Sequence, residues 1–276
     1  MGEKYAKVNG CKICYEVFGE GNKKPIFLIH GFGAKKETWI AQIPELSKKY
    51  RVIIMDNRGA GKSDRPNENY TMKNFADDIA AIMDFLNIEK AHVAGWSFGG
   101  MIVQHFALNY PEKLDKLILL FTNYKGQGIE LYKKLRHEDL DLLHEDPEKL
   151  FWQGARMGYY RKFRKEMENN PSEKFFGIWS VNDLIKESII DPPTHHDIDN
   201  QAVALETHNT LKDLHKIENQ TLLIAASHDR VCPMSTMKEM HEEIPNSEFH
   251  VIEKAGHSAP MSRTTEVNKI ILEFLK

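Results

Sequence analysis

The chain has 276 residues, of which 41% are hydrophobic, and this is enough to bury a sizeable core. A formal net charge of −3 and a sequence pI near 6.5 exclude the basic surface typical of nucleic-acid-binding proteins. The first residues lack the apolar run of a signal peptide, and no apolar stretch approaches the roughly 20 residues that span a bilayer. Three cysteines favour a reducing compartment over a disulfide framework. We therefore expect a cytoplasmic protein that binds neither nucleic acid nor a membrane.

The first two strand-like runs, residues 5–8 and 11–18, predict a hairpin, because Asn9-Gly10 between them is a type I′ turn signal. Cys11 and Cys14 form a C-x-x-C pattern within the second run. Residues three apart on a strand point to opposite faces, so we predict two ordinary strand cysteines, not a redox or metal pair.

Strand-like and amphipathic helical runs alternate through most of the chain. The expected buried strands are residues 25–29, 51–55, 91–94, 116–121, 221–226 and 248–252. The expected helices are residues 36–50, 72–86, 100–108, 234–243 and 264–275. Such alternation predicts βαβ units and an α/β fold with a parallel sheet covered on both faces.

The middle of the chain differs, because no convincing buried strand occurs between about Tyr124 and Ile217. This stretch is rich in charged and aromatic residues and is broken by four prolines. We predict a set of short helices inserted into the α/β fold as a cap. The predicted division is a core of residues 1–123 and 217–276, with a helical cap of residues 124–216.

Gly95-Trp96-Ser97-Phe98-Gly99 is a G-x-S-x-G pentapeptide between a strand-like run and a helix-like run. In such a nucleophile elbow the serine lies on a sharp, strained turn that exposes its hydroxyl above the sheet. Side chains at the flanking glycines would collide with the neighbouring strand and helix. We therefore predict that Ser97 is a nucleophile.

Two residues at the ends of later strands complete a candidate catalytic triad. Asp229 follows the strand 221–226 and His257 follows the strand 248–252, in the chain order Ser, Asp, His that this kind of sheet requires. His257 would accept the proton of Ser97, and Asp229 would fix the imidazole tautomer. The rival position for the acid, after the strand 116–121, offers Asn123 and no carboxylate.

A tetrahedral intermediate needs preorganised donors for its oxyanion. One is expected to be the backbone N–H of Phe98, directly after the nucleophile. The second should come from His30-Gly31-Phe32-Gly33, after the strand 25–29, where the glycines let the backbone approach a substrate. The N–H of Phe32 is our choice.

These motifs resemble those of the α/β-hydrolase superfamily of serine hydrolases with a helical cap. The likeness covers both core segments. Within the superfamily, the chain is most similar to the branch of enol-lactonases, haloperoxidase-like esterases and carbon–carbon bond hydrolases. It implies an eight-stranded, mostly parallel sheet with helices on both faces, and a substrate pocket between core and cap. Trp96 and Trp179 are candidates for that pocket, with packing as the alternative for each. We expect no cofactor and no metal.

Two other patterns have simpler explanations. Gly59-Ala60-Gly61-Lys62-Ser63 invites a phosphate-loop interpretation, but Asp56 stands where the Walker pattern needs glycine. A turn of the hydrolase fold, held by Arg58 and Asp64, explains it better. His195, His196, Asp197 and Asp199 lack the fixed spacing of a zinc motif, so we expect an exposed cap loop.

The sequence thus predicts a serine hydrolase that cleaves a small carboxylic ester or lactone through an acyl-enzyme, as a monomer or homodimer. The alternatives are a carbon–carbon bond hydrolase of vinylogous diketones, a small-peptide aminopeptidase and, outside enzymes, a non-catalytic ligand receptor on the same fold. Epoxide hydrolases and haloalkane dehalogenases are disfavoured, because those relatives place Asp where this chain has Ser97.

Overall fold

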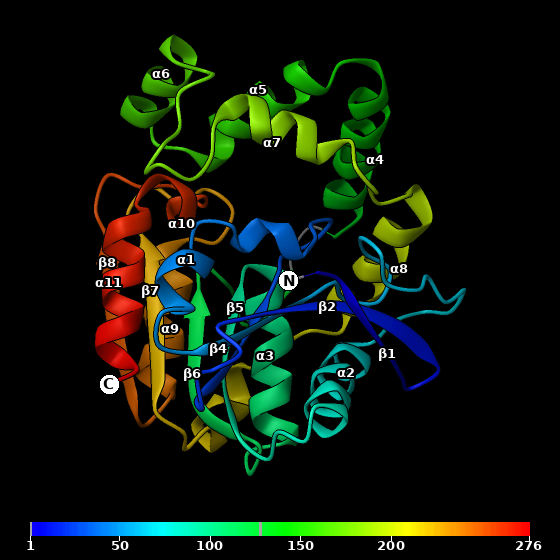
Figure 1. Cartoon of the computed structure of the whole chain (residues 1–276), viewed down its shortest axis with the longest axis vertical. Coiled ribbons are helices and arrows are strands. Elements are labelled where there is room, and N and C mark those ends of the chain that lie inside the picture. The colour runs from blue at the N-terminus through cyan, green and yellow to red at the C-terminus, as the bar shows by residue number, and fades with distance from the viewer. Residues whose placement is uncertain (1, 127–128) are drawn as a thin grey trace.

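The computed structural model describes residues 2–126 and 129–276, and a single sheet runs through its centre (Figure 1). The strands are β1 (Lys4–Val8), β2 (Cys11–Phe18), β3 (Pro25–Ile29), β4 (Arg51–Met55), β5 (Ala91–Trp96), β6 (Leu114–Leu120), β7 (Thr221–Ala226) and β8 (Ser247–Ile252). They form one eight-stranded sheet in the order β1-β2-β4-β3-β5-β6-β7-β8. The pairs β1–β2 and β2–β4 are antiparallel, and all the other neighbouring pairs, which include β3, are parallel. The predicted fold class is confirmed.

The hairpin of β1 and β2 turns at Asn9 and Gly10, whose φ angles of 47° and 73° are those of a type I′ turn. Cys11 lies opposite Val8 and Cys14 opposite Tyr5, and both thiols are free and buried. The two cysteines are therefore strand residues, as predicted.

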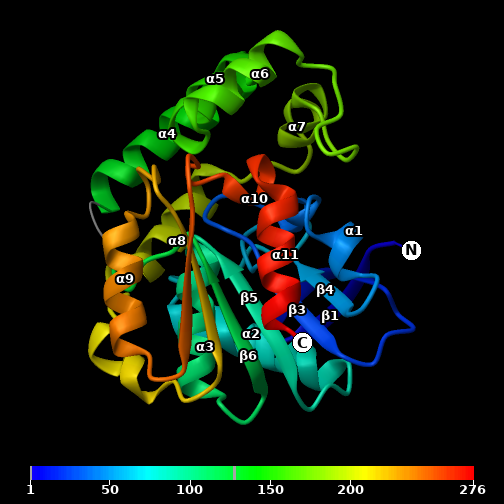
Figure 2. The same ribbon diagram turned by 90° about the vertical axis from the view of Figure 1, so that its left-hand side faces the viewer.

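Alternate residues of β3 enter the two apolar layers that flank the sheet. Phe27 and Ile29 pack into one layer and Ile26 and Leu28 into the other, because successive side chains on a strand point to opposite faces. The first layer is covered by α2 (Met72–Phe85), α3 (Phe98–Asn109) and α9 (Met234–Glu243). The second is covered by α1 (Ile43–Leu46), α10 (Ala259–Ser262) and α11 (Thr264–Phe274), on the other side of the sheet in Figure 2.

The prediction of one helix over residues 36–50 is wrong. The segment forms two short pieces, the 3₁₀ helix η1 (Lys36–Trp39) and α1. Pro44 lies in the first turn of α1, where its missing N–H is tolerated, and it would break a helix that began earlier. Lys36 is almost fully buried, with its ammonium 2.6 Å from Glu37 and 3.4 Å from Asp56. This ion-pair network holds η1 against the end of β4.

Five helices and a 3₁₀ helix occur between β6 and β7 in the described part of the chain. They are α4 (Ile129–Glu145), α5 (Pro147–Gly158), α6 (Arg161–Asn169), α7 (Val181–Ser188), α8 (His195–Glu206) and η2 (Leu211–Lys216). In Figures 1 and 2, α4 to α7 lie beyond one end of the sheet, whereas α8 lies beside the core. η2 packs against α3 and α9. We keep the word cap for residues 124–216. Among the described residues, no helix is long and apolar enough to cross a membrane.

Candidate active site

Ser97 lies between the end of β5 and the start of α3, with φ 58° and ψ −119°. A non-glycine residue in this region is strained, and such strain is typical of functional sites. The turn is tight on both sides. A Cβ on Gly95 would lie 2.2 Å from the carbonyl oxygen of Gly99, and one on Gly99 would lie 2.1 Å from that of Ile29. The steric role predicted for these glycines is therefore confirmed.

The backbone of the elbow is fixed to the neighbouring strand. The N–H of Ser97 donates to the carbonyl of Leu120 at 2.9 Å, and the Thr122 hydroxyl donates to the carbonyl of Ser97 at 2.7 Å. Thr122 lies two residues after the end of β6, and sequence reasoning missed it. Its only signal was its place at the same edge of the sheet as Ser97.

Asp229 and His257 meet at this edge, although they come from loops after two different strands. The Nδ1 atom of His257 lies 2.8 Å from Oδ2 of Asp229, whose side chain is fully buried. The other carboxylate oxygen accepts the N–H groups of Val231 and Cys232, each at 2.8 Å. The carboxylate is thus held by its own loop. Because it accepts from Nδ1, the proton lies on that atom and Nε2 is left with a lone pair.

The main chain of the histidine loop is held from the core and from the cap. The indole N–H of Trp96 donates to the carbonyl of His257 at 3.2 Å, and the two rings lie 6.3 Å apart. On the cap side, the N–H of Ser258 donates to the carbonyl of Gly158, at the end of α5, at 2.8 Å. A Cβ on Gly256 would lie 2.6 Å from the same carbonyl oxygen. The cap backbone therefore lies directly against the loop of His257.

Cys232 is a second neighbour of Ser97 that sequence reasoning missed. Its thiol is enclosed, burial raises its pKa well above the ordinary value, and the Ser97 side chain contacts it. Its position three residues after Asp229, on the same loop, was the available signal. A neutral thiol at this place bounds the space around the serine hydroxyl.

The loop that holds the proposed second oxyanion donor passes beside the nucleophile. A Cβ on Gly31 would lie 3.5 Å from Cβ and 3.9 Å from Oγ of Ser97. Burial lowers the pKa of His30, and its neutral ring accepts the N–H of Asn57 through Nε2 at 3.0 Å. The rings of Phe32 and Phe98, whose N–H groups we assigned to the oxyanion, lie 5.7 Å apart. The loop and the elbow are therefore neighbours.

The two tryptophans assigned to the pocket lie in different surroundings. Trp96 is nearly buried, beside His257. Trp179 is fully buried within the cap, 5.0 Å from the ring of Phe175 and 6.1 Å from that of Phe163. This arrangement favours packing for Trp179, while a pocket role for Trp96 stays a prediction.

The Gly59–Ser63 loop is held by the two residues expected to hold it. Arg58 donates to both carboxylate oxygens of Asp78 in α2, at 2.7 and 2.8 Å. Asp64 accepts the N–H of Lys12 in β2 at 2.8 Å. The loop is thereby joined to a helix and a strand of the core.

The segment from His195 to Asp199 is not an exposed loop, and that expectation is wrong. It forms the start of α8, where the side chains of Thr194 and Asp197 make a capping box. Asp197 is fully buried and pairs with Arg65 at 2.9 Å. Over residues 2–126 and 129–276, no three His, Cys, Asp or Glu side chains gather in a way that could hold a metal ion.

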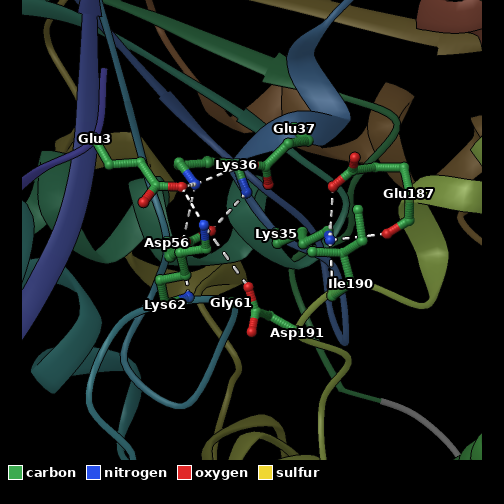
Figure 3. Close-up of a pocket in the computed structure, with 10 residues that line it drawn as sticks. All are labelled: Glu3, Lys35, Lys36, Glu37, Asp56, Gly61, Lys62, Glu187, Ile190 and Asp191. Atoms are coloured by element: carbon green, nitrogen blue, oxygen red, sulfur yellow. Dashed lines mark hydrogen bonds and ion pairs between the residues drawn. The ribbon is translucent and has the colours of Figure 1, made fainter.

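A separate cavity of about 200 Å³ lies where the N-terminal segment, the segment 35–37 and the end of α7 meet (Figure 3). Charged side chains dominate its wall, and they already pair with one another, as Lys62 does with Glu3 at 2.5 Å and Lys36 with Glu37. None of the triad candidates lines it. We therefore do not regard it as the substrate pocket.

Known proteins are similar to this chain over nearly its whole length. The family model for the alpha/beta hydrolase fold matches residues 24–264. The AB hydrolase superfamily protein YisY of Bacillus subtilis is 29% identical over 262 residues, 92% of each chain. The 2-hydroxy-6-oxo-6-phenylhexa-2,4-dienoate hydrolase of Comamonas testosteroni is 28% identical over 273 residues, 96% of this chain and 91% of that one. A solved structure of a thermophilic esterase from Thermogutta terrifontis, with malate bound, has a TM-score of 0.82 and 26% identity, covering 100% of this chain and 98% of the other.

The family model covers far more than half of the chain, and the eight-stranded, mostly parallel sheet agrees with the fold that it describes. The chain belongs to the alpha/beta hydrolase fold family.

Proposed function

We propose that this hydrolase cleaves a small carboxylic ester or lactone through an acyl-enzyme on Ser97. The observation that carries the proposal is the 2.8 Å contact between His257 and the buried carboxylate of Asp229, at the sheet edge where Ser97 lies in its strained turn. A histidine oriented by a buried carboxylate can accept the proton of a neighbouring serine hydroxyl and so make it a nucleophile.

The proposed reaction has two halves. Nε2 of His257 takes the proton of Ser97 while Oγ bonds to the substrate carbonyl carbon, and the oxyanion accepts the N–H groups of Phe32 and Phe98. Collapse of this intermediate breaks the bond to the leaving oxygen, which takes the proton from the imidazolium. A water molecule then repeats the sequence on the acyl-enzyme and releases the acid. Asp229 stays ionised throughout and stabilises the imidazolium.

Turnover of a p-nitrophenyl ester by the wild-type chain and by Ser97→Ala tests the proposal. We expect the substitution to lower kcat on the order of 10⁴-fold or more, because no other group supplies the nucleophile. Ser172→Ala, an exposed serine of the cap, is the matched control and should keep wild-type activity. Undiminished turnover by Ser97→Ala would refute the assignment.

Covalent labelling separates an enzyme from a ligand receptor on the same fold. A fluorophosphonate should add to Ser97 in the wild-type chain and not in Ser97→Ala, as read by intact mass. A receptor with a reactive serine would be labelled yet show no more than one turnover of ester per chain. Multiple turnovers together with labelling are the expected result.

Carbon–carbon bond hydrolysis is the second candidate, because the dienoate hydrolase of Comamonas testosteroni matches this chain over 96% of its length. The same triad would serve, so geometry around Ser97 does not separate the two reactions. Comparison of kcat/KM for short esters, lactones and vinylogous diketones does. We expect the esters or lactones to have the higher kcat/KM. A higher kcat/KM for the diketones would make carbon–carbon bond hydrolysis the proposed function in place of ester hydrolysis.

A further inference from the structure

The loop of residues 30–35, which we call the oxyanion loop, is held by the cap at two points. One is Gln201 in α8 and the other is the carboxyl end of α7. The sheet supplies only the start of this loop, because β3 ends at Ile29. The core holds the ring of His30 through Asn57 and packs Phe98 against Phe32, and the cap contacts add anchors at Gly33 and Lys35.

Gln201 makes the more direct of the two contacts. Its side-chain oxygen Oε1 accepts the N–H of Gly33 at 2.9 Å, and its Nε2 donates to the carbonyl of Gly59 at 3.2 Å. The residue is only 1% exposed, so water does not replace these hydrogen bonds. The amide bridges two core loops, which are also joined by the hydrogen bond of the Asn57 N–H to the His30 ring.

Helix α8 also fits closely against the loop. Gly33 has φ +62°, and a Cβ there would lie 3.2 Å from Cδ1 of Ile198, one turn before Gln201. The start of α8 is fixed in turn by the pair of buried Asp197 with Arg65 at 2.9 Å. Gln201 is thus presented to the loop by a helix that is itself attached to the core.

The far end of the oxyanion loop is held by Lys35. Its ammonium donates to the carbonyl of Glu187 at 2.9 Å and to that of Ile190, and it pairs with the Glu187 carboxylate at 2.7 Å (Figure 3). These three partners use all three of its N–H donors. They also satisfy carbonyls at the carboxyl end of α7, where a cation is favoured by the helix dipole.

We propose that Gln201 is a positioning residue for the oxyanion hole. The inference rests on the proposed function, since it concerns the donor at Phe32. The N–H of Gly33 belongs to the same planar peptide as the carbonyl of Phe32, so Gln201 fixes the orientation of that plane, which joins the plane of the Phe32 N–H at Cα of Phe32. The N–H of Phe32 lies in the preceding peptide plane, whose carbonyl of Gly31 accepts the N–H of Ala34 at 3.3 Å. Gln201 therefore acts on this N–H through the short turn from Gly31 to Ala34, and we expect it to keep the N–H directed toward the carbonyl that Ser97 attacks.

The expected effect is on the transition state more than on substrate binding. Loss of one oxyanion donor lowers kcat by about 10²–10³-fold, and a donor displaced by a fraction of an ångström loses part of that. We therefore expect Gln201→Met, which keeps the unbranched shape without the amide, to lower kcat by about 10- to 100-fold with KM within about twofold. Gln201→Glu keeps an oxygen for the Gly33 N–H, and because burial favours a protonated carboxyl it also keeps a donor for the Gly59 carbonyl, so this variant should recover most of that loss.

The test measures kcat, KM and the inhibition constant of a trifluoromethyl ketone, whose tetrahedral adduct places an oxyanion in the hole. In Gln201→Met the inhibition constant should rise by the same factor as kcat falls. Gln153→Met, on the exposed face of α5, is the matched control and should match wild type. Where Gln201→Met does not fold, as judged by circular dichroism, the comparison of Gln201→Glu with Gln201→Ala gives the same readings.

Wild-type kcat and ketone affinity in Gln201→Met would overturn the inference, and so would a Gln201→Glu variant no better than Gln201→Met. Failure of the proposed function looks different. In that case the wild-type chain itself shows neither ester turnover nor labelling at Ser97, whatever residue occupies position 201.

Discussion

Replacement of Ser97 by glycine should stabilise the fold relative to replacement by alanine. Both substitutions remove the hydroxyl, so their difference isolates the effect of Cβ at this position. The backbone there has φ 58° and ψ −119°, a region that suits glycine and strains any other residue. The nucleophile position is therefore predicted to store strain that only glycine releases.

The size of the effect follows from two opposing contributions. A non-glycine residue in such a region costs about 1–3 kcal/mol. Glycine loses more chain entropy on folding than alanine, which offsets about 0.4–1 kcal/mol. The free energy of unfolding of Ser97→Gly should thus exceed that of Ser97→Ala by about 1–2 kcal/mol. For a chain of this size we expect a Tm higher by about 2–8 °C.

Thermal and urea unfolding, followed by circular dichroism, measure this difference. The matched pair is Lys238→Gly and Lys238→Ala, at an exposed position in the middle of α9. In a helix the order reverses, and the glycine variant should be less stable by about 0.8–1 kcal/mol. If Ser97→Gly is no more stable than Ser97→Ala while the Lys238 pair behaves as expected, the elbow is not strained and the reasoning fails.

Three further outcomes are expected. Asp229→Asn should lower kcat by up to about 10⁴-fold through the wrong imidazole tautomer, and a loss below about tenfold would point to another acid. Arg58→Met leaves the buried carboxylate of Asp78 without its cation and should lower the free energy of unfolding, measured in urea, by about 3–5 kcal/mol. The double variant Arg58→Met with Asp78→Leu should lose clearly less, and an equal loss would contradict a buried ion pair. Burial lowers the pKa of His105 to about 4 and of His208 to about 3, so the unfolded chain, whose histidines titrate near 6.5, binds more protons than the folded one in this range. The free energy of unfolding should therefore fall as pH is lowered from about 6.5 toward about 4. A double variant, His105→Gln with His208→Gln, whose unfolding free energy keeps the same slope against pH would refute this.

The residues of the candidate site could be predicted because they follow parallel strands. Carboxyl ends of parallel strands meet at one edge, so the ends of β5, β7 and β8 bring Ser97, Asp229 and His257 near each other whatever the intervening chain does. Buried strands are also short apolar runs, and the predicted bounds of β3, β4 and β7 agree with the structure. These inferences need only local patterns and one rule of topology.

One error arose where distant residues decide the local structure, and the other where a short capping pattern decides it. The segment 36–50 has helical spacing, yet Lys36 forms buried ion pairs with Asp56 and Glu37. Pro44 is tolerated only in the first turn of a helix, so α1 begins there and not at residue 36. At the start of α8 the capping pair of Thr194 and Asp197 was present in the sequence. This pattern predicts the start of a helix, whereas the absence of zinc-motif spacing says nothing about whether the segment is a loop.

Contacts such as that of Gln201 with Gly33 could not be predicted from one sequence, because they join positions 168 residues apart and leave no periodic pattern. They nevertheless bear on what the cap does. The carbonyl of Gly158 in α5 binds the N–H of Ser258 beside His257, and α8 binds the oxyanion loop, whereas the backbone of Ser97 is held by β6 and by Thr122. Two parts of the proposed machinery are thus attached to the cap and one to the sheet. A cap that only selected substrates would change KM alone. We expect a displacement of a cap attached in this way to change kcat as well, because it would move the proposed base and the proposed oxyanion donor relative to Ser97.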